Sequence, residues 1–264
     1  MRRAPIASIP SAIVGSAAGP IEHDIDSRWL MAYSAALNEM GRGVHPLFPV
    51  CYEWPVSLPI RQIPQLRELF PLLVHAEHDL RLHRLPREGD RLATRASIVG
   101  VQKRKPGASV VFRFETLDAK GKPVSTTDFG ALYRGVDVEG PDRGATIELP
   151  QAAANMKPTG TIDVGANLAH VYTECARIFN PIHTDVAHAK AAGLPDIILH
   201  GTATLALSVS CLKIDPARVR RVRCRFTGMV FMPSRLEVFG NGTDFETRGP
   251  KGEAVISRGR IDHD

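Results

Sequence analysis

The alternation of apolar and polar residues predicts two similar halves. In the first half, residues 25–39 carry apolar side chains at helical spacing. Strand-like runs follow at 91–101, 108–117 and 122–135, and the segments between them, KRKPG and DAKGK, have the composition of tight hairpin turns. The first half is therefore predicted to contain a helix and an antiparallel meander.

The second half repeats this order after a change in composition. Residues 136–165 are rich in Gly, Pro and Ala without sustained periodicity, so we expect a linker there. A segment at 166–178 then leads to a short helix at 186–193, which Gly193 is expected to end. Three further strands are predicted, at 219–226, 235–242 and 253–261.

A helix predicted at 201–214 indicates how the second half is built. Its side chains are small or apolar on every face, so we expect the helix to be buried rather than half exposed. A buried helix followed by antiparallel strands suggests a sheet wrapped around a central helix.

Composition limits the class of protein. The chain has 264 residues, 44% apolar and 23% charged, which is typical of one large or two small globular domains. Cys51, Cys175, Cys211 and Cys224 form no CxxC pair, which indicates reduced thiols in a cytoplasmic protein rather than a metal site. No apolar run approaches the ~18 residues of a membrane-spanning helix.

The ends of the chain add two expectations. Residues 1–19 begin with two arginines followed by small apolar residues, as in a signal peptide, but prolines interrupt the apolar part. We expect a flexible arm or a first strand there. The last residues, GRIDHD, match no lipidation or peroxisomal signal.

The net charge of +5 and the pI of about 9.2 are modest for nucleic-acid binding, and a polyphosphate small molecule matches a local basic patch better. Arg221, Arg223 and Arg225 alternate along a predicted strand and so share one face. Two interpretations stay open: a grip on phosphates, or a solvated strand face. The basic hairpin tip at 102–107 is interpreted as solvated.

Several phrases of the sequence resemble one family. YTECARIFNPIHTD, AAGLPDIILHGTATLALS and RCRFTGMVFMPSRLEV are similar to the MaoC-like, (R)-specific enoyl-CoA hydratases. In the first half, LLVHAEHDLRLHRLPREGDRLATRASIVGV and DFGALYRG resemble the degenerate N-terminal repeat of two-repeat members. The resemblance covers about residues 20–262 and is strongest between 172 and 208.

The resemblance implies an α+β double hot-dog fold, in which one continuous antiparallel sheet wraps around a central helix in each half. The halves are expected at 20–135 and 166–264. The implied activity is reversible hydration of a 2-enoyl-CoA to a 3-hydroxyacyl-CoA by a homodimer. No cofactor beyond the CoA thioester, no metal, and no nucleic-acid or membrane partner is expected, and CoA is preferred to acyl-carrier protein as the carrier.

The chemistry assigns roles to four residues. His183 is the candidate general base, because an imidazole titrates near neutral pH. Asn180 shapes the NPIH turn or contacts the ligand. Gly201 and His200 begin the buried helix, whose free N–H groups favour an anion, and a glycine permits close approach of a thioester. His200 and the three arginines are assigned to CoA binding, with packing or capping as the alternative for His200.

The sequence departs from the family motif at one position. The family has Asp-x-Asn-Pro-x-His, and here Ile178 stands in place of the aspartate. Glu174 would share a helical face with Ile178 and could substitute for the carboxylate. Asp185 is interpreted as a structural residue that follows the histidine.

Two motifs of the first half bear on the site. HPLF at 45–48 is the counterpart of NPIH, so Phe48 stands where the second half has His183. HAEH at 75–78 has the spacing of a metal pair on a helix, but the family resemblance places it before a strand and disfavours a metal.

Three functions remain open. The first is the hydro-lyase, with His183 as base and Gly201 in the oxyanion site. The second is an acyl-thioester-binding protein without turnover, which Ile178 favours. The third is a hot-dog thioesterase, which is disfavoured because the predicted helix at 201–214 carries no carboxylate.

Overall fold

The computed structural model describes residues 7–41 and 43–264. The first six residues of the predicted N-terminal arm, 1–19, therefore lie outside the described residues. The remainder of that arm contains strand β1 (Ser8–Pro10), a 3-10 turn η1 (Ser11–Ile13) and the start of β2 (Ala17–Asp24). The expectation of a first strand is thus confirmed for the described part of the arm.

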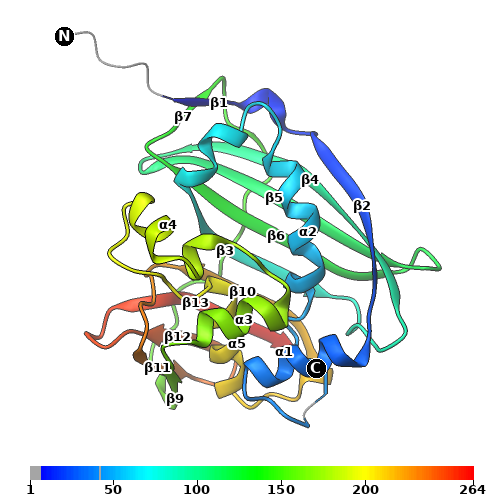
Figure 1. The fold of residues 1–264 in the computed structure, drawn as a ribbon, viewed down its shortest axis with the longest axis vertical. Helices are drawn as coiled ribbons and strands as arrows, with labels where there is room; N and C mark the ends of the chain where they lie inside the picture. Colours follow the sequence, from blue (N-terminus) through cyan, green and yellow to red (C-terminus); the bar gives the residue numbers. More distant parts are fainter. Residues whose placement is uncertain (1–6, 42) are drawn as a thin grey trace.

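One long antiparallel sheet forms the frame of the molecule (Figure 1). From one edge, the first half contributes β2, β4 (Arg91–Arg104), β5 (Gly107–Asp118), β6 (Pro123–Arg134) and β3 (Leu73–Leu82). The second half continues with β10 (Val219–Phe226), β13 (Ala254–His263), β12 (Asp244–Arg248), β11 (Ser234–Gly240) and β9 (Lys157–Val164). The predicted meander at β4, β5 and β6 is confirmed.

The two halves meet where β3 pairs with β10. The pairing is antiparallel, and Cys224 lies opposite His78 in its register. Backbone hydrogen bonds therefore run without interruption from one half into the other, and the sheet is continuous as predicted.

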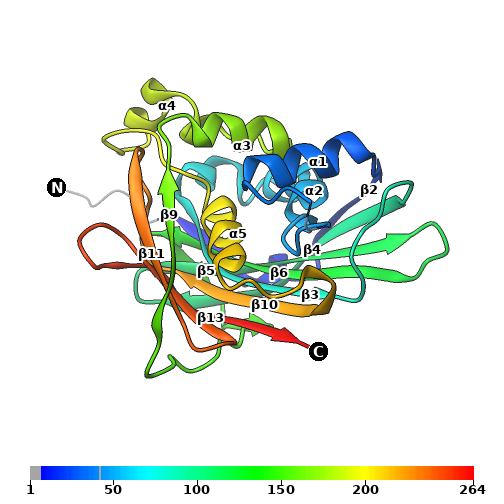
Figure 2. The ribbon, with the colours of Figure 1, turned by 90° about the horizontal axis from the view of Figure 1, so that it is seen from below.

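Helices lie on the concave side of the curved sheet (Figure 2). Each half supplies a short helix, α1 (Ser27–Ala36) or α3 (Leu168–Ala176), and these two pack side by side. Each half also supplies a longer helix, α2 (Pro49–Arg61) or α5 (Gly201–Cys211). The remaining helical segments are η2 (Arg67–Leu72), η3 (Pro181–His183), α4 (Val186–Ala191) and η4 (Pro216–Arg218).

Helix α5 confirms the prediction of a buried helix at 201–214, although it ends at Cys211. Its inward side chains, among them Ala203, Leu205 and Ala206, are fully buried in the core of the second half. Small residues let the strands approach the helix closely, because a Cβ on Gly160 of β9 would come within 3.1 Å of the Cys211 sulfur.

Helix α2 is the central helix of the first half, and its pattern did not predict it. Pro55 and Pro59 lie inside the helix, where each removes a backbone N–H. Burial of Val56 and Ile60 in the core between α2 and the sheet offsets this cost.

The expected linker at 136–165 is only partly irregular. It contains β7 (Asp137–Glu139), which pairs with β1, β8 (Arg143–Gly144), which pairs with β4, and the whole edge strand β9. Backbone pairing with distant strands, rather than local periodicity, fixes these short elements. Strand β12 was also missed. None of the helices in the described part of the chain has the length and apolar character that a membrane crossing requires.

Candidate active site

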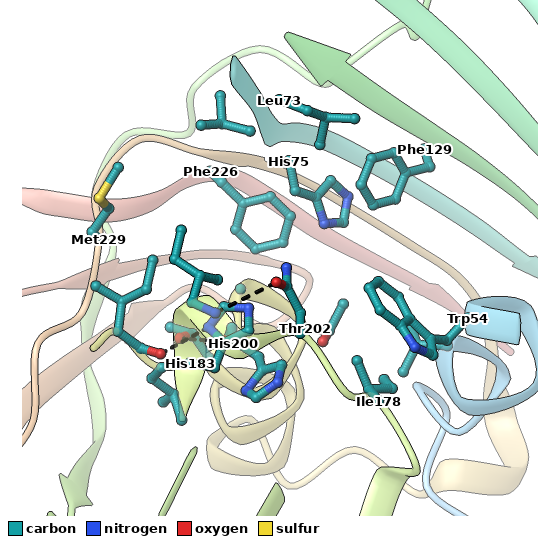
Figure 3. Close-up of a pocket in the computed structure, with 18 of the residues that line it drawn as sticks. Trp54, Leu73, His75, Phe129, Ile178, His183, His200, Thr202, Phe226 and Met229 are labelled. Atoms are coloured by element: carbon teal, nitrogen blue, oxygen red, sulfur yellow. Dashed lines mark hydrogen bonds between the residues drawn. The ribbon is translucent and has the colours of Figure 1, made fainter. Parts of the chain in front are cut away.

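A cavity of about 380 Å³ lies where the two halves meet (Figure 3). The first half lines it with side chains of α2, β3 and β6, including Trp54, His75 and Phe129. The second half lines it with the end of α3, the η3 turn and the first turn of α5. His183, Asn180, Ile178, His200 and Gly201 all border this cavity, so the structure brings together the residues that the second-half motifs predicted.

The NPIH turn holds the His183 ring in one orientation. Asn180 is the N-cap of η3, and its Oδ1 accepts a long hydrogen bond of 3.5 Å from the Ile182 N–H. The His183 Nδ1 lies 2.8 Å from the Ile198 carbonyl oxygen. Because a carbonyl only accepts, Nδ1 carries the proton in the neutral ring, and Nε2 keeps its lone pair for another partner.

Burial keeps this imidazole neutral. It lowers the pKa of His183 to about 4, although the hydrogen bond to the Ile198 carbonyl acts in the opposite direction. The ring also stacks on His200, with centroids 3.7 Å apart and planes 26° apart. At neutral pH His183 is therefore an uncharged proton acceptor.

His200 is the last residue before α5, and it is buried. Its Nε2 lies 3.3 Å from the Thr173 hydroxyl, whereas its Nδ1 has no partner among the described residues. Gly201 follows as the first helical residue, and a Cβ there would lie 3.3 Å from the Phe226 ring. The first turn of α5 thus borders the cavity through Gly201 and Thr202, and the N–H groups of a first helical turn have no partner within the helix.

Ile178 occupies a position where a carboxylate could act. Arg177 ends α3 in the left-handed conformation, with φ of 58°, and the chain then directs Ile178 into the core, where its relative exposure is 5%. Ile178 borders the same cavity as His183. An aliphatic side chain therefore lines the same cavity as the imidazole and offers no proton acceptor there.

The proposed substitute, Glu174, does not reach the cavity. It is exposed and lines a separate surface hollow with Asp26 and Trp29, because its side of α3 faces α1. Asp185 caps α4 by accepting from the Ala187 and His188 N–H groups, which fits the structural role predicted for it. Among the described residues that line the cavity, the carboxylic side chain is Glu53 of α2.

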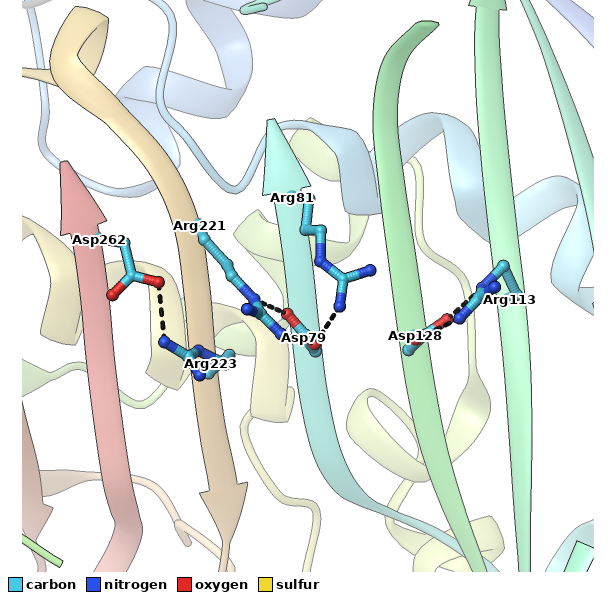
Figure 4. Close-up of polar contacts among 7 residues, drawn as sticks. All are labelled: Asp79, Arg81, Arg113, Asp128, Arg221, Arg223 and Asp262. Atoms are coloured by element: carbon cyan, nitrogen blue, oxygen red, sulfur yellow. Dashed lines mark hydrogen bonds and ion pairs between the residues drawn. The ribbon is translucent and has the colours of Figure 1, made fainter. Parts of the chain in front are cut away.

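The three arginines of β10 lie on the outer face of the sheet, and Figure 4 shows two of them, Arg221 and Arg223. Val222 and Cys224 alternate with them and point into the core, so the arginines point away from the helices and the cavity. Arg221 pairs with Asp79 at 2.6 Å, Arg223 with Asp262 at 2.7 Å, and Arg225 with Glu77 at 3.2 Å. The three arginines do share one face, as predicted. Their side chains form ion pairs on the strand surface, which gives no support to a role in binding the CoA phosphates.

The first half contributes residues to the cavity that sequence analysis either missed, as for Arg61 and Glu53, or considered only as a metal pair, as for His75 and His78. Arg61 and Glu53 project from α2, and His75 and His78 from β3. The HAEH motif lies on a strand, and a bulge after His75 lets both histidines face the cavity. In the described chain, no three His, Cys, Asp or Glu side chains gather into a possible metal site.

Comparison with known proteins assigns the second half. Residues 155–256 match the model of the MaoC like domain. The second half is a MaoC-like domain. The match begins inside the predicted linker and covers β9, the NPIH turn and α5, and so includes His183 and Gly201.

The curated proteins to which the chain is similar are longer than it is. Peroxisomal multifunctional enzyme type 2 of Drosophila melanogaster is 28% identical over 76% of the chain and 36% of its own length. Peroxisomal hydratase-dehydrogenase-epimerase of Saccharomyces cerevisiae is 27% identical over 64% of the chain and 20% of its own length. The chain therefore spans about a third or less of these relatives.

Solved structures confirm the fold. A MaoC-like dehydratase from Phytophthora capsici has a TM-score of 0.81 at 20% identity, covering 96% of this chain and 97% of that one. A Mycobacterium tuberculosis protein described as having a double hotdog fold has a TM-score of 0.64 at 13% identity, with coverages of 94% and 95%. The predicted α+β double hot-dog architecture is therefore correct.

Proposed function

We propose that the chain reversibly hydrates a 2-enoyl thioester, most simply an acyl-CoA, with His183 as the proton-transfer residue. The observation that carries the proposal is the fixed tautomer of His183 in the cavity that the first turn of α5 also borders. The MaoC-like domain and its hydratase relatives support the same reaction class.

The reaction requires a base, a proton donor and stabilisation of the thioester oxygen. The His183 Nε2 takes a proton from water, and the hydroxide oxygen bonds to the β-carbon. Electrons of the double bond shift toward the thioester, whose oxygen gains charge close to the N–H groups of Gly201 and Thr202. The protonated imidazole then returns its proton to the α-carbon, so one residue can serve as both base and acid.

The scheme lacks a carboxylate as a second acid–base group beside His183, and this absence should lower the rate of turnover. Loss of one member of an acid–base pair commonly reduces catalysis by about 10²–10⁴-fold. The single-imidazole scheme therefore predicts slow turnover compared with a site that carries both groups.

Ile178 specifically favours a second candidate, which is thioester binding without turnover. Its buried aliphatic side chain lines the cavity at the position of the family aspartate. In that case the apolar lining still accommodates an acyl group, but neither water nor the imidazole is activated.

Loss of enoyl absorbance separates the two candidates. A panel of 2-enoyl-CoA esters of different chain length is mixed with the protein, with His183→Ala and with His263→Ala as a matched control on the far strand β13. Hydration by wild type and the control, reduced at least about 10²-fold in His183→Ala, is the expected result. Binding of the esters without hydration by any of the three proteins would contradict the proposal and support the binder.

A further inference from the structure

The part of the cavity inside the first half contains a buried guanidinium. Arg61, at the C-terminal end of α2, has a relative exposure of 3%. No carboxylate lies within ion-pair distance of it in the described chain, and its Nε has no hydrogen-bond partner there. Burial lowers the pKa of Arg61 to about 10, which still leaves it charged at neutral pH.

Aromatic rings surround this cation without neutralising it. The guanidinium carbon lies 4.6 Å from the centre of the Phe129 ring, 5.6 Å from Phe112 and 5.8 Å from Trp54. Such contacts partly compensate a buried cation, but a charge removed from water ordinarily also needs an anion. The acid that lines the cavity, Glu53, accepts a 2.6 Å hydrogen bond from Thr127 rather than from Arg61.

A continuous wall of rings joins this cation to the candidate base. His183 stacks on His200, and the next residue, Gly201, lies against the Phe226 ring. Phe226 is 4.5 Å from His75 between ring centres, and His75 stacks on Phe129 at 3.7 Å. Figure 3 shows these side chains facing one another around the cavity.

At the end of this wall near Arg61, several ring nitrogens have no hydrogen-bond partner in the part of the chain that the structure describes. Both ring nitrogens of His78 and the Nε2 of His75 are buried without a partner in the described chain. Both histidines line the cavity together with Arg61. A neutral imidazole carries one N–H, so His78 can donate one hydrogen bond to an anionic group held beside the buried cation.

We infer that the cavity selects an acyl thioester whose acyl group ends in a carboxylate, with Arg61 as the partner of that carboxylate. The monothioester of a short dicarboxylic acid is thus the substrate class, and the apolar rings accommodate its methylene groups. This inference rests on the proposed function only in assuming that the thioester end lies near His183 and α5.

Binding of saturated esters tests the inference without requiring turnover. Succinyl-, glutaryl- and adipyl-CoA are compared with butyryl-, valeryl- and hexanoyl-CoA by calorimetry, so that the CoA part cancels within each pair. We expect the carboxylated ester of the best-fitting length to bind at least about tenfold more tightly. Arg61→Met should bring this ratio close to one, whereas Arg81→Met, on the outer face of β3, should leave it unchanged.

Arg61→Lys provides a second variant that retains the charge, and it should keep part of the preference. Thermal unfolding of every variant shows whether it is folded, and the wild-type ratio is informative even if Arg61→Met is not. Equal affinities within each pair in the wild type, as expected if Arg61 holds only a free anion, would overturn the inference. A preference that survives in folded Arg61→Met would overturn it as well.

The two proposals fail separately. A preference for the carboxylated ester that depends on Arg61, without hydration of any enoyl ester, would refute the proposed function and support the inference. Hydration without the preference would do the reverse. Failure of all six saturated esters to bind, together with hydration of the enoyl esters, would overturn the inference alone.

Discussion

The two halves share a backbone plan but differ in chemistry at equivalent places. Tyr33 of α1 and Tyr172 of α3 meet across the junction, with hydroxyl oxygens 3.4 Å apart. The Tyr33 ring lies 5.5 Å from Phe48, the residue before α2, and Tyr172 lies 5.0 Å from His200, the residue before α5. In this comparison Phe48 and His200 occupy the same place.

The predicted pairing of HPLF with NPIH holds only for the local turn. The side chains of His45 and Asn180 each accept a hydrogen bond from the N–H two residues later. In the first half the turn leads directly into α2, whereas α4 and a loop separate NPIH from α5 in the second half. Phe48 therefore ends the turn, as His183 does, and also precedes the central helix, as His200 does.

The backbone also has the same conformation at the C-terminal ends of α1 and α3. Asn38 and Arg177 both have positive φ values, 55° and 58°. The next residues, Glu39 and Ile178, return their N–H groups to Ser34 and Thr173. The first half thus carries a carboxylate where the second carries Ile178, and the second carries imidazoles where the first has Phe48. The same backbone arrangement therefore carries different chemical groups in the two halves.

The largest change should come from restoring a carboxylate at Ile178. Ile178→Asp is expected to raise enoyl-CoA hydration by about 10²–10⁴-fold, because a second acid–base group joins His183. Initial rates measure the effect, and Ile178→Asn, which has nearly the same shape without the charge, should show no comparable gain. An unchanged rate in folded Ile178→Asp would mean that this position does not face the reacting atoms.

A polar side chain at the equivalent place in the first half should cost stability. Phe48 is buried, and its ring packs against those of Trp29, Tyr33 and Tyr52. Phe48→His should lower the free energy of unfolding by about 1–3 kcal/mol, because its ring nitrogens are buried without partners. Urea unfolding measures this loss, and Phe48→Leu separates it from the effect of reduced volume.

Helix α2 carries the buried acid Glu53, whereas α5 carries no acid. Burial raises the pKa of Glu53 to about 8, although the Thr127 hydrogen bond opposes the shift. The folded state keeps this proton while an unfolded glutamic acid loses it near pH 4.5. Stability contributed by Glu53 is therefore lost as pH rises from about 4.5 to 8.

Between pH 6.5 and 8, the contribution of the histidines to stability is common to wild type and Glu53→Gln, so the difference between the two proteins reports Glu53 alone. Wild type should lose roughly 2 kcal/mol more than Glu53→Gln over this interval, at about 1.4 kcal/mol per pH unit. Urea unfolding at each pH measures the difference. Parallel stability curves for the two proteins would contradict the raised pKa.

The smallest predicted effect concerns the pH dependence of hydration. Because the pKa of His183 is lowered to about 4, kcat/KM should stay nearly constant from pH 8 to 5 and fall below that range. An imidazole with the ordinary value of 6.5 would already lose about tenfold by pH 5.5. A profile with its midpoint near 6.5 would show that His183 is more hydrated than its burial indicates.

Sequence reasoning succeeded where a pattern is local. The alternation of β4, β5 and β6 and the apolar surface of α5 identified these elements, and NPIH and LHG identified one side of the cavity. Helix α2 was missed because Pro55 and Pro59 interrupt its pattern, although its burial stabilises it. Arg61, His75 and Phe129 meet only because the curved sheet brings α2 against β3 and β6, and no spacing along the chain encodes that proximity.

The pairing of β3 with β10 also determines the binding stoichiometry that we expect under the proposed function. Two separate hot-dog subunits joined in this way would present two identical sites, and each would have to retain every reactive group. Here both walls of the cavity belong to one polypeptide and they are not interchangeable. A titration should therefore saturate at one acyl group per chain, with the thioester end in the second half and the acyl end in the first.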